Sequence, residues 1–236
     1  MSAVAVLQAS DASSPLKLFT YFSDHRSDVL SWLGSHAWLS ALPVVLGLVI
    51  ALPLGWLARR YRWVYPPMVT LTGLLYTIPS IALFVAVPRI IGTKTLDPLN
   101  VAIALTIYTV ALLVRVVADG LGNVPDDVAQ AATAMGYTRV QRLVRVELPL
   151  AVPVIAAGLR VAAVSNVSMV AVAGTIGVPE LGQLFTNGFQ LSTTGPYYPP
   201  IALGILLCLL LAIVFDALIQ LGTRALTPWR RAVAAR

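Results

Sequence analysis

Charged and polar side chains of this sequence gather in one short stretch, which runs from Asp126 to Pro149. The stretch reads DDVAQAATAMGYTRVQRLVRVELP and holds three acidic residues and three arginines between two long apolar segments. It has no cysteine, no histidine and no nucleophile set beside a base, so it lacks the parts of a catalytic or metal site. Its residue types favour contact with another protein surface instead.

Local signals divide this stretch into two short helices. Pro125 suits the first helical position, where its missing N–H costs nothing, and Asp126 and Asp127 favour the positive end of the helix dipole. Gly136 is a typical helix stop, because glycine adopts the left-handed conformation that ends helices. Thr138 is then expected to cap a second helix.

The two predicted helices differ in their faces. The first is rich in alanine, and its exposed small residues would allow close approach to a partner backbone. The second has an apolar face and an arginine face, and Pro149 is expected to end it. Docking into a partner's groove and packing of the alanines against the membrane helices both fit this pattern. The residues concerned are Ala129, Ala131, Ala132 and Ala134 in the first helix, and Val140, Leu143, Val144 and Leu148, with Arg139, Arg142 and Arg145, in the second.

Composition places the chain in a membrane. Of 236 residues, 58% are hydrophobic and 11% are charged, whereas a soluble domain usually carries about a quarter charged residues. Its single cysteine, Cys208, allows no internal disulfide and is interpreted as a packing residue. Five segments are long and apolar enough to cross a bilayer, and they predict an all-α polytopic membrane protein. The predicted spans are 36–58, 65–87, 99–118, 150–176 and 199–221.

Basic residues predict the orientation of these spans. Eleven lysines and arginines fall in or beside the loops after spans one and three and in the tail 226–236, against four on the other side. The positive-inside rule therefore places the N-terminus outside and the C-terminus in the cytoplasm. Residues 1–35 are expected outside, as a short interfacial helix or as a partly ordered terminus. Tyrosines near span ends are predicted to be interfacial anchors: Tyr76, Tyr108, Tyr197 and Tyr198.

Polar residues inside two spans are candidates for a transport path. Pro79 predicts a kink, Thr77 and Ser80 could satisfy the freed backbone groups, and Tyr76 lies close by. We interpret this bend as lining the path, and a simple packing kink is the alternative.

Span 150–176 contains Arg160, Ser165 and Asn166. Arg160 is expected either to extend toward the cytoplasmic interface or to pair with Asp216 in the last span. Asn166 and the serines either line a lumen or bridge neighbouring helices.

The polar stretch resembles the "EAA" signature of permease subunits of binding-protein-dependent ABC importers. The matching pattern is Ala131-Ala132, three residues, Gly136, nine residues, and then Val146-x-Leu148-Pro149. Gln130 departs from the glutamate usual in the family, which removes a charge at that position. The resemblance implies a MetI-like fold in which 125–149 forms a coupling loop that contacts the ATPase. The implied contact residues are Gln130, Ala131, Ala132, Met135, Gly136, Leu148 and Pro149.

Further segments, YTIPSIALF and AGTIGVPELGQLF, are similar to the osmoprotectant branch of these permeases, over roughly residues 36–225. That branch imports glycine betaine, choline, carnitine or proline betaine. The resemblance implies three protein partners: ABC ATPase subunits, a second permease subunit and an extracytoplasmic binding protein. ATP and Mg would be bound by the ATPase, because this chain has no G-x-x-x-x-G-K-[ST] motif. No metal site, catalytic residue or nucleic-acid contact is expected in the chain itself.

Other readings of the sequence remain. The same permease role for methionine or another amino acid fits the composition equally well. An ion-coupled secondary transporter would show internal repeats and ionisable relays at mid-membrane, and the sequence has neither. A membrane-embedded enzyme would need a cluster of catalytic groups, whereas His25 and His36 both precede or begin the first span.

Overall fold

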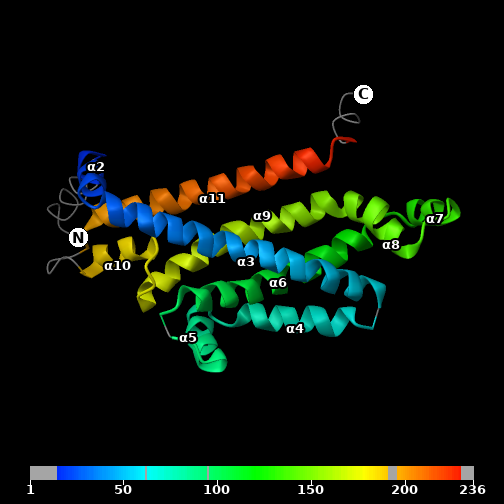
Figure 1. The fold of residues 1–236 in the computed structure, drawn as a ribbon, viewed down its shortest axis with the longest axis horizontal. Helices are drawn as coiled ribbons and strands as arrows, with labels where there is room; N and C mark the ends of the chain where they lie inside the picture. The colour runs from blue at the N-terminus through cyan, green and yellow to red at the C-terminus, as the bar shows by residue number, and fades with distance from the viewer. Residues whose placement is uncertain (1–14, 62, 95, 191–195, 230–236) are drawn as a thin grey trace, which may run out of the picture. The chain divides into compact units, whose positions relative to one another are not determined.

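The structure is a computed structural model that describes residues 15–61, 63–94, 96–190 and 196–229, all helical or loop, with no strand among them. Figure 1 shows the helices in chain order. Their bounds are α2 Pro15–Asp24, α3 Arg26–Arg60, α4 Tyr65–Thr77, α5 Ser80–Ile91, α6 Pro98–Gly122, α7 Asp126–Ala134, α8 Arg139–Arg142, η1 Leu143–Glu147, α9 Leu148–Ala173, η2 Gly174–Ile176, α10 Gly182–Gln190 and α11 Tyr198–Leu226.

Four of these helices are long and apolar enough to cross a membrane, or five if α4 and α5 form one broken span. The expected fold class, an all-α membrane protein with about five spans, is therefore confirmed. The single transmembrane domain expected over 36–225 stays a prediction. The described chain divides into two compact units, each built from three stretches. Unit 1 comprises 1–42, 80–105 and 165–213, and unit 2 comprises 43–79, 106–164 and 214–236.

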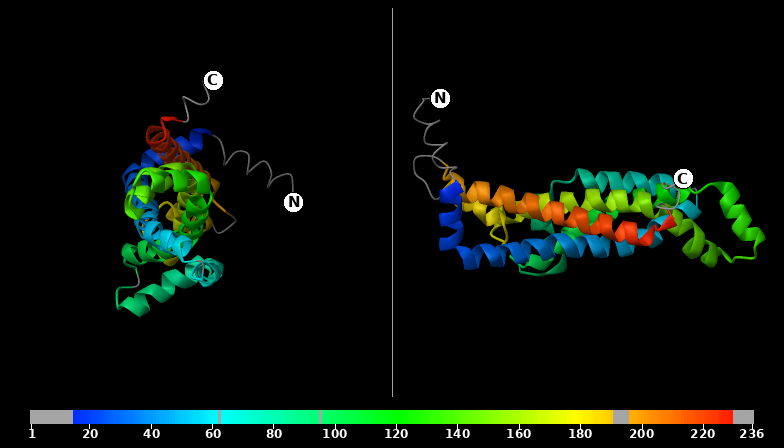
Figure 2. Two further views of the ribbon diagram at one scale, coloured as in Figure 1. Left: turned by 90° about the vertical axis from the view of Figure 1, so that its right-hand side faces the viewer. Right: turned by 90° about the horizontal axis from the view of Figure 1, so that it is seen from above.

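Helix α2 and the part of α3 up to Leu42 belong to unit 1, and the rest of α3 belongs to unit 2. The first spanning helix, α3, begins at Arg26 rather than at residue 36, and α2 lies across its first turns (Figure 2). Tyr21 and Val29 are buried in one apolar cluster with Leu181 and Leu184, and burial raises the pKa of Tyr21 above its usual value. The segment before span one is thus packed into the unit, because its apolar residues have partners on α10 and α11.

The predicted span 65–87 is two helices rather than one kinked helix. Helix α4 ends at Thr77 and α5 begins at Ser80, because Pro79 cannot donate a backbone hydrogen bond. Thr77 Oγ1 donates to the Leu74 carbonyl at 2.7 Å, as expected. The Ile78 carbonyl accepts from the Tyr108 hydroxyl. Tyr108 is only 3% exposed, so its predicted role as an interfacial anchor is wrong.

The core of unit 2 joins α3, α6 and α9. Its buried members include Ala51, Leu113, Val117 and Ile155. Close approach of α3 to α6 depends on Gly55, where an added Cβ would lie 2.6 Å from Val117 Cβ and 2.9 Å from the Val114 carbonyl oxygen. Small residues at such contacts allow membrane helices to pack tightly.

This contact yields a stability prediction. Gly55→Ala should lower the thermal midpoint of the detergent-solubilised chain, because the new methyl group meets backbone as well as side-chain atoms. Gly73→Ala is the matched control on α4, since no atom lies within 4 Å of a Cβ there. Alanine is favoured over glycine in helices by about 1 kcal/mol, so the control should be neutral or stabilising. Equal midpoints for the two variants would contradict the close α3–α6 contact.

Candidate coupling site

The predicted coupling loop forms a helical hairpin in unit 2. Helix α7 begins at Asp126, with Pro125 as its N-cap rather than its first helical residue. The two acidic residues of the first turn face the positive end of the helix dipole. Gly136 has a φ of +84°, which glycine adopts without strain, and it turns the chain toward α8. Figures 1 and 2 show α7 and α8 side by side, as expected from the glycine between them.

Thr138 caps the second helix, as predicted. Its hydroxyl accepts from the Gln141 backbone N–H at 3.4 Å, and its own N–H donates to Gln141 Oε1 at 2.9 Å. This reciprocal arrangement is a capping box, and it satisfies two backbone donors at a helix start. Gln141 was not singled out from the sequence, although its place three residues after Thr138 is the signal.

Arg142 fastens the hairpin to the helix that follows. Its Nε donates to Glu147 Oε1 at 2.6 Å, and Nη1 donates to Thr133 Oγ1 at 3.1 Å. The Arg142 side chain is 33% exposed and that of Glu147 16%. One guanidinium therefore joins α7, α8 and η1, a role that the predicted arginine face did not anticipate.

Pro149 does not end a helix. Leu143–Glu147 form a π-helical turn, and the Leu148 N–H bonds back to the Leu143 carbonyl. Such a turn shifts the hydrogen-bond register by one residue, which accommodates a proline near the start of the next helix. Helices α8, η1 and α9 consequently follow one another without a break in the chain.

Exposure separates the predicted contact residues into two groups. Gln130, Ala131 and Gly136 are exposed, and Met135 is 69% exposed. Ala132 is 1% exposed, so it packs inside unit 2 and cannot be an exposed contact. The predicted apolar face of the second helix is also divided. Leu143 and Leu148 pack against the unit 2 core, whereas two other residues of that face are exposed to solvent or lipid. Those exposed residues are Val140 and Val144.

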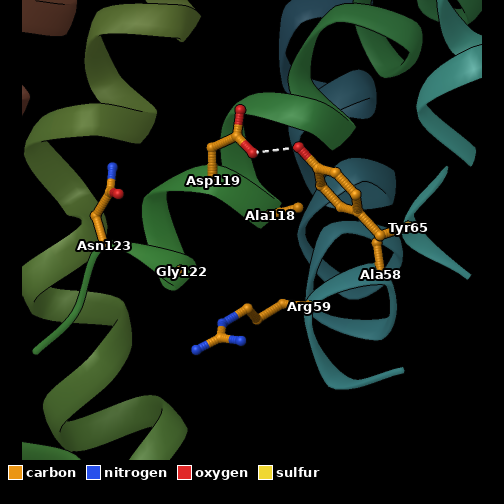
Figure 3. Close-up of a pocket in the computed structure, with 7 residues that line it drawn as sticks. All are labelled: Ala58, Arg59, Tyr65, Ala118, Asp119, Gly122 and Asn123. Atoms are coloured by element: carbon orange, nitrogen blue, oxygen red, sulfur yellow. Dashed lines mark hydrogen bonds between the residues drawn. The ribbon is translucent and has the colours of Figure 1, made fainter. Parts of the chain in front are cut away.

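Two polar clefts of unit 2 share Arg59, and hairpin residues line the first of them. One, of about 380 Å³, is lined by Gln130, Asp126, Arg142 and Glu147 among others. The other has a volume of about 620 Å³ and appears in Figure 3. There the Tyr65 hydroxyl donates to Asp119 Oδ1 at 2.6 Å, and the Arg59 guanidinium points away from this pair. Gln130 lies in the first of these two clefts, where polar surroundings suit an amide as well as a carboxylate.

The candidate path residues belong to different units. Tyr76, Pro79 and Arg160 are in unit 2, and Ser80, Ser165 and Asn166 are in unit 1. Tyr76 is 41% exposed and its ring packs edge-on against Tyr108, with ring centroids 5.7 Å apart. Asn166 is 2% exposed. Their role in a transport path stays a prediction.

Of the two alternatives for Arg160, the structure shows the ion pair. Its Nε donates to Asp216 Oδ1, and Nη2 donates to Oδ2 at 3.0 Å. Gln220 adds a third hydrogen bond to the same carboxylate at 2.6 Å. This two-point geometry between α9 and α11 neutralises both charges inside the spanning helices, as a charge at that depth requires.

A second polar pair, His36 with Glu180, was not predicted from the sequence. The residues are 144 positions apart, and their hydrogen bond measures 2.8 Å in unit 1. A glutamate within an otherwise uncharged segment, Gly174 to Gln190, was the available signal.

The four or five helices that are long and apolar enough to cross a membrane indicate a multi-pass membrane protein. Residues 43–227 match the family described as binding-protein-dependent transport system inner membrane component. This match covers most of the chain, so the chain belongs to that family of permease subunits.

The matches to two curated relatives cover nearly the whole length of each relative. The osmoprotectant import permease protein OsmW of Salmonella typhimurium is 37% identical over 211 residues, which cover 88% of this chain and 96% of the relative. The glycine betaine/carnitine/choline transport system permease protein OpuCD of Bacillus subtilis is 30% identical, with 91% of each chain covered.

The fold has a solved counterpart. Inward-facing structures of the MetNI methionine ABC transporter include a chain with a TM-score of 0.71 and 24% identity, and the match covers 84% of this chain and 96% of that one. At this identity the likeness shows the fold alone, and it confirms the expected MetI-like architecture.

The hydrogen bonds of Arg142 predict the behaviour of α7. Arg142→Ala should speed hydrogen exchange at the α7 amides, because Thr133 and Glu147 lose their shared donor. Arg139→Ala is the control, since Arg139 lies exposed on the same short helix. Exchange followed by mass spectrometry of the purified chain would measure the difference. Identical exchange in both variants would show that Arg142 does not fasten the hairpin.

Proposed function

We propose that this chain is the permease subunit of an ATP-driven importer for a small osmoprotectant such as glycine betaine, choline, carnitine or proline betaine. The observation that carries the importer role is the exposed α7–α8 hairpin, with Met135 between its two helices and a continuous helical connection through η1 to α9. The osmoprotectant cargo is supported by the relatives whose names state it, over nearly the full length of both chains.

The proposed mechanism is alternating access driven by a partner. ABC ATPase subunits bind ATP and Mg and hydrolyse the ATP, and this chain contributes no catalytic residue. Closure of the ATPase dimer pulls on the coupling loops, the membrane path opens outward, and hydrolysis resets it. The α7–α8 hairpin suits this role, because a short helix with small exposed residues fits a groove on a partner.

Further partners complete the proposed assembly. A second permease subunit, identical or paralogous, pairs with this one, because five spans enclose a path poorly. A binding protein delivers the solute to the extracytoplasmic face. The chain lies in the bacterial cytoplasmic membrane with its N-terminus outside and its C-terminus in the cytoplasm, as the distribution of basic residues favours.

The same role for methionine or another amino acid is the alternative cargo. Its support is the MetNI likeness, which concerns the fold and not the solute. An ion-coupled secondary transporter is a remote alternative, since the charged side chains Arg160 and Asp216 neutralise each other.

Met135 provides a sharp test of the coupling site. Met135→Asp should abolish co-purification of the ATPase and solute uptake, because an exposed apolar contact is replaced by a charge that must be desolvated on docking. Phe189→Asp is the matched control, since Phe189 is 65% exposed but lies on α10 in unit 1. That control should retain the ATPase.

A separate experiment determines on which side of the membrane Met135 lies. Met135→Cys, made with Cys208→Ala, should react with an impermeant thiol reagent in inverted vesicles and not in intact cells. Labelling of intact cells would overturn the orientation, whereas normal ATPase binding by Met135→Asp would overturn the docking assignment.

Uptake assays test the cargo. Cells that lack their own osmoprotectant importers should accumulate labelled glycine betaine only when this chain is expressed with its ATPase and binding protein. Met135→Asp serves as the uncoupled control, and labelled methionine as the competing solute. Uptake of methionine without betaine would keep the importer and reject the osmoprotectant cargo.

A further inference from the structure

Unit 1 contains a titratable pair that the proposed transport mechanism does not use. His36 lies on α3, Glu180 lies between η2 and α10, and both side chains are 0% exposed. His36 Nδ1 is 2.8 Å from Glu180 Oε2, and His36 Nε2 is 3.0 Å from the Val167 carbonyl oxygen. Three segments distant in the sequence therefore meet at one imidazole ring.

Hydrogen-bond chemistry sets the smallest number of protons that this pair holds, and a third proton, on Oε1, would leave an isolated positive charge buried. A carbonyl oxygen only accepts, so Nε2 must carry a hydrogen that it donates to Val167. The 2.8 Å contact at Nδ1 needs a second proton, which lies either on the ring or on the carboxyl group. Both arrangements contain the same two protons and have no net charge.

The other charge state conflicts with the geometry. A neutral ring that bonds Val167 through Nε2 would turn its Nδ1 lone pair toward an ionised carboxylate. That state would also bury an isolated negative charge, which is far costlier than a neutral pair. Among the described residues, the Glu180 carboxyl accepts only from His36 and from the Gly182 N–H at 2.7 Å, and Oε1 has no partner. No second cation is therefore bonded to the carboxyl group to stabilise such a charge.

Glycines on either side shape the turn around this carboxyl group. A Cβ at Gly174 would lie 2.6 Å from Glu180 Oε1 and 2.7 Å from Gly182 Cα. A Cβ at Gly182 would press against the Ala171 carbonyl and Oε1. The turn thus leaves space for the folded-back Glu180 side chain and for little else.

We propose that His36 and Glu180 share one proton as a net-neutral buried pair, which positions the turn from Gly174 to Gly182 against α3 and α9. The pair goes beyond the proposed import function, because neither the cargo nor the ATPase requires a proton at this place. Its two residues act as positioning residues for the segment that links α9 to α10.

Stability of variants tests the positioning role. Glu180→Gln keeps the shape of the side chain but only one of the two hydrogen bonds that Oε2 makes, because an amide group cannot both donate to Nδ1 and accept from the Gly182 N–H at that place. Its thermal midpoint should therefore fall less than that of Glu180→Ala. Glu180→Ala and His36→Ala should each lower the midpoint clearly, because each leaves a buried polar partner unpaired. The double variant His36→Ala with Glu180→Ala should lose less in thermal midpoint than the two single losses added together. Its loss should be close to that of one single variant, because the first substitution already removes the shared interaction.

Ser40→Ala is the matched control for these variants. Ser40 lies one turn after His36 on α3, is 0% exposed, and its hydroxyl has no hydrogen-bond partner in the described residues. Its removal should be neutral, which shows that loss of a buried polar group on this face is not harmful in itself. Equal stability of Glu180→Ala and Glu180→Gln would overturn the positioning role.

Spectroscopy tests the shared proton directly. In a His25→Gln background, His36 is the only histidine, so ¹⁵N labelling reports its ring alone in lipid nanodiscs. The proposal expects either two protonated ring nitrogens, or a bare Nδ1 with a protonated carboxylic acid band in the infrared spectrum that Glu180→Gln removes. A neutral ring beside an ionised carboxylate would overturn it. Neither measurement needs transport, so failure here is distinct from failure of the import assignment.

Discussion

The structure depends above all on the requirement that backbone polar groups be satisfied where no water is available. In hydrocarbon an unpaired N–H or carbonyl costs several kcal/mol, so each spanning segment forms its own hydrogen bonds as a helix. The break at Ile78 and Pro79 is informative for this reason. The carbonyls freed there accept from Thr77 and from the Tyr108 hydroxyl, one local and one from a different helix. A break is tolerated because side chains replace the missing backbone donors.

Features governed by local chemistry could be predicted from the sequence. Hydropathy located the apolar helices, and Thr138 and Gly136 were identified as cap and turn because their roles depend on neighbours within a few residues. The contacts that the sequence did not predict join residues that are distant in the sequence. The His36–Glu180 bond and the Tyr108–Ile78 bond join positions that no local pattern links. For Ala132 the sequence left exposure and packing against the membrane helices open, and the structure shows it buried.

The course of the chain after the hairpin has a structural consequence. Pro149 predicts a helix end, but the π-turn at Leu143–Glu147 absorbs the missing hydrogen bond and the helix continues. Arg142 then ties α7 and α8 to this turn through Thr133 and Glu147. The hairpin is consequently joined to the start of α9 by hydrogen bonds and by continuous helix.

The pairs Arg160–Asp216 and His36–Glu180 avoid an unpaired charge inside the protein in different ways. Arg160 and Asp216 are partly exposed, at 43% and 28%, and gain from a two-point contact and from Gln220. Two opposite charges in two-point contact carry no net charge, so both members can stay charged. His36 and Glu180 are both 0% exposed. Their pair is stable only while it holds its proton, because the cost of burial rises with net charge rather than with the number of polar atoms. Residue type and position in the fold together decide which of these pairs depends on a proton, because a guanidinium keeps its proton in proteins whereas an imidazole can lose one.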